Sequence, residues 1–323
     1  MKKEDLKILF MGTPEFALGS LKSLVENNFN VIGVFCKPDK PKGRGMKLVA
    51  PPVKEYAILN NIPVFQPEKI KDNEEVKDIL NTLKPDLIVV VAYGKILPKF
   101  VLEYPKYRCI NVHGSLLPKY RGAAPIQWAV INGETVSGIT TMYMDEGMDT
   151  GDIITKKECK IDAKDTYGTL GEKLMVLGAN TLVEDLERLI KCDGKLESIK
   201  QSEDFSVAPM LSKEISKIDF NNSAKSIVNL VRGTNPAPIS WCKLDDERVY
   251  KIYEAEEIVL DNINFEDYKI GEIAYLNDKK NIFAIRCKDG FISLTKIKPA
   301  GSKLMNSGDY IRGNKVKVNE IFI

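Results

Sequence analysis

Short apolar runs alternate with amphipathic stretches along the first half of the chain. Residues 7–11, 31–35 and 87–92 are nearly continuous apolar runs, which are typical of strands buried on both faces of a sheet. Between them, residues 53–60 and 74–83 carry apolar side chains at helical spacing. We therefore predict an α/β fold, in which strands and helices alternate around a doubly wound, Rossmann-like, mostly parallel sheet.

The second half of the chain follows a different pattern. Leucines at helical spacing predict a long helix over residues 166–190, and the polar residues after it are typical of a linker. A short helix is predicted at 224–231. Short β-prone runs follow at 249–253, 271–275, 282–286, 291–297 and 315–318. Closely spaced short strands favour a smaller, OB-like β-barrel. The expected division is an α/β domain at 1–192, a linker at 193–207 and the barrel domain at 208–323.

Composition narrows the class of protein. Hydrophobic residues make up 44% and charged residues 28% of the 323 residues, and no apolar run approaches the roughly 18 residues of a membrane span. With no signal peptide evident, we expect a cytoplasmic protein. The formal net charge is +2, but residues 268–323 hold eleven basic and five acidic side chains. Such a bias is typical of a solvated face, and it would also suit a surface that follows phosphates.

Two common kinds of site are absent from the sequence. The six cysteines are scattered without a C-x-x-C spacing and the chain has one histidine, so we predict reduced thiols and no zinc site. The turn Gly12-Thr13-Pro14-Glu15 lacks the G-x-G-x-x-G pattern of dinucleotide binding. Neither NAD nor a P-loop nucleotide is expected.

The one histidine, His113, ends a predicted strand at 109–113. The carboxyl ends of parallel strands are where open α/β sheets bind ligands, and Asn111 points to the same side of the strand as His113. An amide and an imidazolium together could hold a developing oxyanion. The acidic loop at 145–152 could supply a carboxylate that fixes the tautomer of His113. A lone histidine is more often a surface or core residue, and such a loop is more often a surface turn.

Long motifs in the chain resemble a known family. Residues 111–125 and 144–152 are each similar, without gaps, to the 10-formyltetrahydrofolate-dependent formyltransferases. Residues 11–17, 37–47 and 91–98 resemble the members that formylate methionine carried by a tRNA. The resemblance extends over essentially the whole chain and is weaker in the carboxyl-terminal third.

The resemblance implies a reaction and a set of residues. Asn111, His113 and Asp149 would catalyse transfer of the formyl group from 10-formyltetrahydrofolate, a co-substrate, to the α-amino group of initiator methionyl-tRNA. Folate contacts would come from two loops, namely Ser115, Leu116, Leu117, Pro118 and Val91, Ala92, Tyr93, Gly94. Contacts with tRNA would come from Lys40, Lys42, Arg44 and Lys47, and from the basic carboxyl-terminal barrel. We expect a monomer that requires no metal and binds no membrane.

Other readings of the same residues remain. Without the flanking motif, residues 115–118 would be a simple proline-ended turn and residues 37–47 a mobile surface loop. An N-formyltransferase acting on a sugar nucleotide would share the catalytic residues, but it would not need the basic loop or the basic barrel. A folate- or RNA-binding protein without catalysis is the alternative from another class.

Overall fold

A computed structural model describes residues 2–42, 46–313 and 315–323 of the chain. It divides into two compact units. The first comprises Met1–Pro125, Val136–Lys160 and Gly171–Ala208, and the second comprises Ile126–Thr135, Ile161–Leu170 and Pro209–Ile323. In the part of the chain that the structure describes, no helix combines the length and apolar character needed to cross a bilayer.

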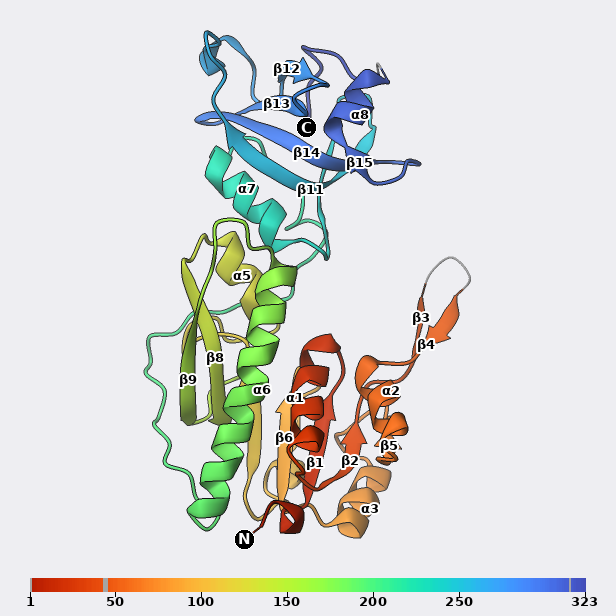
Figure 1. Cartoon of the computed structure of the whole chain (residues 1–323), viewed down its shortest axis with the longest axis vertical. Coiled ribbons are helices and arrows are strands. Elements are labelled where there is room, and N and C mark those ends of the chain that lie inside the picture. The colour runs from red at the N-terminus through yellow and green to blue at the C-terminus, as the bar shows by residue number, and fades with distance from the viewer. Residues whose placement is uncertain (1, 43–45, 314) are drawn as a thin grey trace. The chain divides into compact units, whose positions relative to one another are not determined.

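The first unit is built on a seven-stranded, mostly parallel sheet, which confirms the predicted fold class (Figure 1). The strand order is β5-β2-β1-β6-β7-β8-β9. The strands from β5 to β7 are parallel, whereas β8 and β9 are antiparallel. Their bounds are β1 (Ile8–Gly12), β2 (Val31–Phe35), β5 (Val64–Phe65), β6 (Leu87–Val91), β7 (Cys109–His113), β8 (Val136–Tyr143) and β9 (Ile153–Lys160).

Helices cover both faces of this sheet because its central strands are apolar on both sides. On one face, Gly19 of α1 (Glu15–Glu26) lies against Met175 of α6 (Tyr167–Lys191), and Gly178 of α6 packs on Val112. The absence of a Cβ at both glycines allows this close approach. On the other face, a buried cluster joins alternate residues of β1 and β6 to α3 (Glu74–Leu83) and α4 (Lys99–Leu102). The remaining helices around the sheet are η1 (Lys3–Asp5) and α2 (Pro52–Leu59).

A small hairpin, β3 (Lys40–Lys42) and β4 (Lys47–Val49), extends away from the sheet of the first unit (Figure 1). It contains the basic loop that the sequence singles out. At its base, Lys54 bonds both carboxylate oxygens of Asp39, and Gln66 bonds Asp39 and the carbonyl of Lys37. The hydrogen bond from Lys54 holds the pKa of Asp39 below its usual range.

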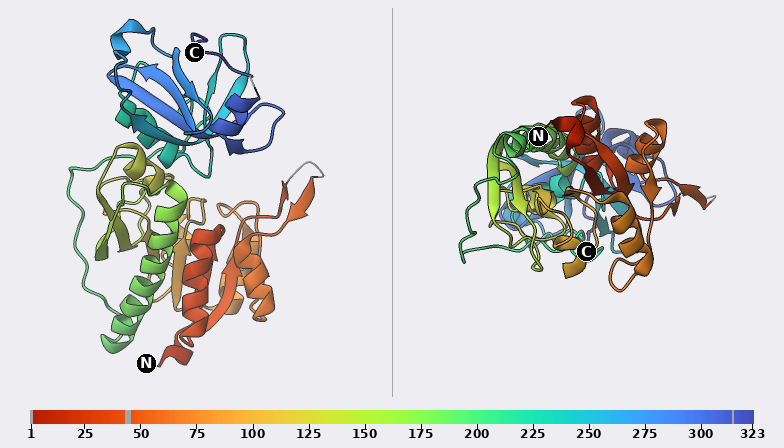
Figure 2. Two further views of the ribbon diagram at one scale, coloured as in Figure 1. Left: turned by 45° about the horizontal axis from the view of Figure 1, so that its top comes forward. Right: turned by 90° about the horizontal axis from the view of Figure 1, so that it is seen from below.

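The second unit contains a six-stranded antiparallel sheet in the order β10-β11-β14-β13-β12, with β15 paired to β14. Helix α7 lies along β11 (Figure 2). The carboxyl-terminal residues bridge both edges of the sheet, because Phe322 pairs with Leu244 and Ile321 with Glu272. The OB-like detail stays a prediction. The bounds are α5 (Pro125–Ile131), α7 (Ala224–Gly233), β10 (Ser240–Lys243), β11 (Val249–Ile258), η2 (Phe265–Asp267), β12 (Ile273–Asn277), β13 (Ile282–Cys287), β14 (Gly290–Pro299), β15 (Met305–Asn306) and α8 (Ser307–Arg312).

One predicted strand is wrong, and one predicted linker has more structure than expected. Residues 315–318 form an irregular turn, because the backbone N–H of Lys317 donates to the Glu320 carboxylate and Val318 is exposed. The segment 193–207 belongs to the first unit. Ile199 pairs with Ile153, and the N–H of Arg121 donates to the carbonyl of Ser206. The two predicted boundaries, at 192/193 and 207/208, stay predictions.

Candidate active site

Strand β7 places Asn111 and His113 on one face of the sheet, as the strand period requires. Asn111 pairs with Val90 of β6 on one side, and His113 pairs with Thr140 of β8 on the other. Asn111 is 8% exposed and His113 is 6% exposed. Within the described residues, the side-chain amide of Asn111 forms no hydrogen bond, and its polar atoms are not fully enclosed. It is therefore free to donate to a bound group.

The fold brings Asp149 to His113 from a loop between β8 and β9. One carboxylate oxygen, Oδ1, lies 3.7 Å from Nδ1 of His113. The other, Oδ2, accepts the backbone N–H of Gly122 at 2.8 Å. Asp149 has φ +56°, a left-handed conformation that Asp tolerates better than most residues. The predicted trio of Asn111, His113 and Asp149 thus gathers at one place.

Both ring nitrogens of His113 face oxygen atoms of the protein. Nε2 lies 3.0 Å from the carbonyl oxygen of Tyr120, which can only accept, so this nitrogen carries a hydrogen. Nδ1 faces the Asp149 carboxylate at a distance longer than a hydrogen bond. When His113 is neutral, Nδ1 is then the nitrogen without a hydrogen. A proton taken up by the ring would therefore enter at Nδ1, beside a carboxylate.

Comparison with known proteins assigns the chain to a family. Residues 6–186 match the model of formyl transferases, and residues 210–315 match that of the formyl transferase carboxyl-terminal domain. The chain belongs to the formyl transferase family.

Curated relatives match over nearly the full length of the chain. The methionyl-tRNA formyltransferase of Clostridioides difficile is 47% identical over 312 residues, covering 97% of this chain and 98% of that protein. The methionyl-tRNA formyltransferase of Clostridium acetobutylicum is 49% identical over 313 residues, covering 96% and 97%.

Solved structures share the fold at lower identity. HypX from Aquifex aeolicus in complex with tetrahydrofolic acid has a TM-score of 0.64 at 17% identity, covering 94% of this chain and 46% of that one. An N-formyltransferase from Helicobacter canadensis in complex with folinic acid and dTDP-3-aminofucose has a TM-score of 0.63 at 22% identity, covering 90% and 98%. At these identities the likeness concerns the fold alone.

In this formyl transferase, Thr140 fixes the loop that follows β7, the strand of Asn111 and His113. Its hydroxyl accepts the N–H of Leu117 at 3.0 Å and donates to the carbonyl of Ser115 at 2.7 Å. The hydroxyl of Ser115 in turn donates to the carbonyl of Lys119 at 2.7 Å. Leu117 is fully buried, and its peptide bond to Pro118 is cis. Residues 115–118 are therefore held in one shape beside His113.

The second predicted folate loop follows β6. Ala92 and Gly94 have positive φ values of 46° and 69°, so the backbone turns sharply there. Tyr93 is 1% exposed and belongs to the buried core under the sheet, where burial raises the pKa of its hydroxyl. Among the described residues this hydroxyl has no hydrogen-bond partner. Since the side chain of Tyr93 is enclosed, any ligand contact of Tyr93 would involve its backbone, whereas Ala92 is exposed.

The predicted tRNA residues fall on the β3–β4 hairpin. Lys40 is exposed. Arg44 and the side chains of Lys42 and Lys47 lie outside the described residues.

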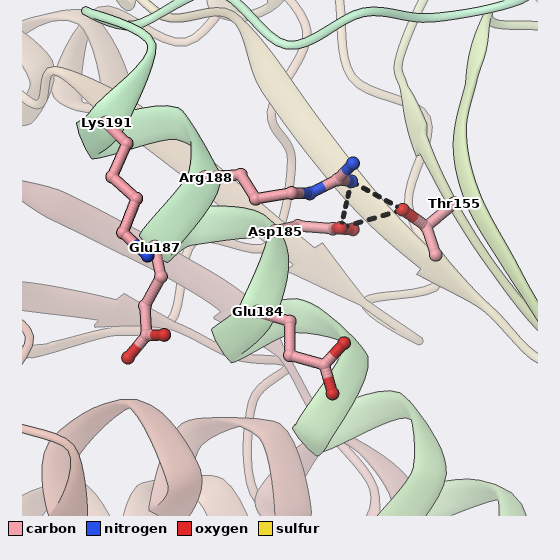
Figure 3. Close-up of a pocket in the computed structure, with 6 residues that line it drawn as sticks. All are labelled: Thr155, Glu184, Asp185, Glu187, Arg188 and Lys191. Carbon is pink, nitrogen blue, oxygen red and sulfur yellow. Dashed lines mark hydrogen bonds and ion pairs between the residues drawn. The ribbon is translucent and has the colours of Figure 1, made fainter.

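A polar recess elsewhere on the first unit does not contain the candidate site. It lies where α6 meets β9 and is lined by Thr155, Glu184, Asp185, Glu187, Arg188 and Lys191 (Figure 3). Asp185 is 1% exposed and accepts hydrogen bonds from Thr155 at 2.8 Å and Arg188 at 2.6 Å. Because these groups satisfy one another, we interpret the recess as structural. No three His, Cys, Asp or Glu side chains of the described residues gather as a metal site would require.

Two residues beside the trio escaped the sequence analysis of the site. Tyr120 supplies the carbonyl that bonds His113, and Gln201 bonds the backbone of the Asp149 loop. Tyr120 lies within the matched motif, so its position was a usable signal. Gln201 lies in the predicted linker, and nothing in the local pattern distinguishes it from its polar neighbours.

Proposed function

We propose that this protein is a methionyl-tRNA formyltransferase, which transfers the formyl group of 10-formyltetrahydrofolate to the α-amino group of initiator methionyl-tRNA in the cytoplasm. The single observation that carries the proposal is the 47% identity to a methionyl-tRNA formyltransferase along 97% of this chain, so that both units are matched. The grouping of Asn111, His113 and Asp149 supports it with chemistry suited to acyl transfer.

Attack of the amine on the formyl carbon places negative charge on the formyl oxygen. The Asn111 amide, which has no hydrogen-bond partner among the described residues, is the proposed donor to that oxygen. Removing one such donor typically lowers turnover by about 100- to 1000-fold. His113 assists through charge, because a proton taken up at Nδ1 makes the ring positive beside Asp149.

The nucleophile does not require a strong base. A free α-amino group has a pKa of roughly 8, and esterification lowers this value, so much of the amine is neutral near pH 7. The amine gives up its proton after attack, and the folate N10 nitrogen leaves with one. The pair of His113 and Asp149 is placed to hold a proton between these two events. The proposed chemistry assigns no step to a metal.

Substrate contacts are proposed from the family resemblance of the motifs. Residues 115–118 and the backbone of residues 91–94 border β7 and would contact the folate. Lys40, Lys42, Arg44 and Lys47 on the hairpin would contact the tRNA, and the basic residues of the second unit would follow its phosphates without reading sequence. We propose that the protein acts as a monomer.

The acceptor can be identified directly. The protein is incubated with 10-formyltetrahydrofolate and either methionyl-tRNA or an amino-sugar nucleotide, and the formylated amine is measured by mass spectrometry. Formylation of methionyl-tRNA is expected. Formylation of the sugar alone would support the alternative acceptor, and no formylation of either would contradict the assigned chemistry.

The basic hairpin gives a second test of the acceptor. Replacing Arg44 with Ala should raise KM for methionyl-tRNA and leave KM for the folate unchanged, because the resemblance implies a tRNA contact for Arg44 and no folate contact. Lys69→Ala, which removes an exposed charge outside the hairpin, is the matched control. Equal weakening of folate binding, or a KM for tRNA that does not depend on salt, would contradict the assignment.

A further inference from the structure

The side chain of Gln201 uses all of its hydrogen-bonding capacity beside the candidate site. Its Nε2 group donates to the carbonyl oxygens of Asp149 at 2.7 Å and Gly151 at 2.8 Å. Its Oε1 atom accepts two hydrogen bonds from the Arg121 guanidinium, at 3.0 Å from Nε and 2.8 Å from Nη2. An amide offers two N–H donors and one oxygen with two lone pairs, so every position is filled.

These partners fix the orientation of the amide. Carbonyl oxygens lie on one side and can only accept, whereas guanidinium N–H groups lie on the other side and can only donate. No other side chain of this length offers both kinds of group. Gln201 is half-buried, whereas residues 202–207 are exposed. Ser206 also bonds the backbone of Tyr120 and Arg121, but only Gln201 of this segment bonds the Asp149 loop among the described residues.

Gln201 joins the two motifs that carry the catalytic trio. Arg121 follows Tyr120, whose carbonyl bonds His113, and precedes Gly122, whose N–H bonds the Asp149 carboxylate. Asp149 is thus held at its carboxylate by one motif and at its carbonyl by Gln201. Its left-handed backbone conformation needs such support, because few residues adopt it without cost.

We propose that Gln201 is a positioning residue for formyl transfer, which sets Oδ1 of Asp149 against Nδ1 of His113 by bridging the Asp149 loop to Arg121. The inference rests on the proposed function for its kinetic consequence, but not for the geometry. Loss of the bridge frees the Asp149 loop while leaving Asn111 and residues 115–118 in place. The effect should therefore fall on kcat and spare KM for both substrates.

Two substitutions test the bridge, whose two halves are the hydrogen bonds to the Asp149 loop and those to Arg121. Gln201→Ala removes both halves. Gln201→Glu keeps an acceptor for Arg121 but puts a carboxylate against the carbonyls of Asp149 and Gly151. Ser202→Glu adds the same charge at the exposed neighbouring position and serves as the matched control. We expect both Gln201 variants to lower kcat by about 10- to 100-fold, because a displacement near 1 Å has effects of that size.

A double-mutant cycle tests whether Gln201 acts through Asp149. In an Asp149→Asn background, Gln201→Ala should lower kcat by less than about threefold, since residues that act as a unit are not additive. The full loss on top of Asp149→Asn would overturn the proposal. So would a wild-type kcat in Gln201→Glu, or a loss confined to KM.

A measurement without turnover keeps the proposal testable if the assigned reaction fails. The chain has one histidine, so ¹⁵N-histidine NMR of the untagged protein reports His113 alone. Gln201→Glu should change the ring-nitrogen signals in the same direction as Asp149→Asn, and Ser202→Glu should leave them unchanged. If the Gln201→Ala protein does not fold, the NMR comparison is made with Gln201→Glu alone. Unchanged signals in a folded Gln201→Glu protein would refute the positioning role, whether or not methionyl-tRNA is the acceptor.

Discussion

Replacing Asp149 with Asn removes one charge from the site and little else. The Asn side chain keeps an oxygen that can accept the N–H of Gly122, and it tolerates the left-handed backbone at this position. What is lost is the attraction between the carboxylate and a positive His113 ring. At 3.7 Å and an effective dielectric constant of about 20, two unit charges attract by roughly 4 kcal/mol. Since about 1.4 kcal/mol corresponds to tenfold in rate, kcat should fall by up to about 1000-fold.

The assay measures initial rates of formylmethionyl-tRNA formation, with each substrate varied in turn. KM for both substrates should stay near the wild-type value, because the charge pair forms during the reaction and not on binding. Glu146→Gln removes a carboxylate that is 71% exposed in the same loop and should leave kcat unchanged. A kcat for Asp149→Asn within about threefold of wild type would refute the charge argument. A raised KM with an unchanged kcat would indicate that Asp149 binds substrate and does not act in catalysis.

Three further changes test other parts of the structure. Thr140→Val should lower the free energy of unfolding by about 1–3 kcal/mol in denaturant and raise KM for the folate. The reason is that the N–H of Leu117 and the carbonyl of Ser115 both lose their buried hydrogen-bond partner, the Thr140 hydroxyl. Burial raises the pKa of the Cys109 thiol to about 12 from 9.0, so the folded protein holds this proton more tightly than the unfolded chain does. The resulting contribution to the free energy of unfolding is complete below pH 9 and is lost as pH rises toward 12. Between pH 7 and 10, wild type should lose about 1.4 kcal/mol more unfolding free energy than Cys109→Ala, with Cys192→Ala, at an exposed thiol, as the control. Tyr250→Phe breaks a buried hydroxyl pair at 2.9 Å and should cost about 1–3 kcal/mol, seen in calorimetry; an unchanged melting temperature would contradict it.

The sequence predicted the parallel half of the first sheet well because its strands are buried on both faces. Strand β6 is buried at every position, and such a run has few interpretations. The long helix was equally clear, since its leucines recur over 25 residues. Strand β9 was not predicted because it is half-buried and rich in charged residues, and its position is set by pairing with β8. At 315–318 the alternation of Lys and Val suggested a strand, yet the structure has a local turn.

The trio could be found from the sequence because its members lie in matched motifs, but the contacts that hold it could not. Gln201 is 52 residues from Asp149 and 80 residues from Arg121, so no local period connects them. The same holds for Thr140, which reaches back 25 residues to the carbonyl of Ser115. Such hydrogen bonds form only because the tertiary fold brings strands and loops that are distant in sequence to the same edge of the sheet. A sequence pattern contains the residues of a site, whereas their support comes from tertiary structure.

The backbone of Asp149 determines which substitution can separate chemistry from support. Asp149 has φ +56°, where Asn costs little but Ala places its Cβ against the backbone at roughly 1 kcal/mol. Asp149→Ala would remove the charge, the bond to Gly122 and the preferred backbone conformation together. Its loss of activity would then resemble that of Gln201→Ala whether Gln201 acts through Asp149 or not. Asp149→Asn retains two of the three features, so non-additivity with Gln201 in that background reports the position of the carboxylate against His113.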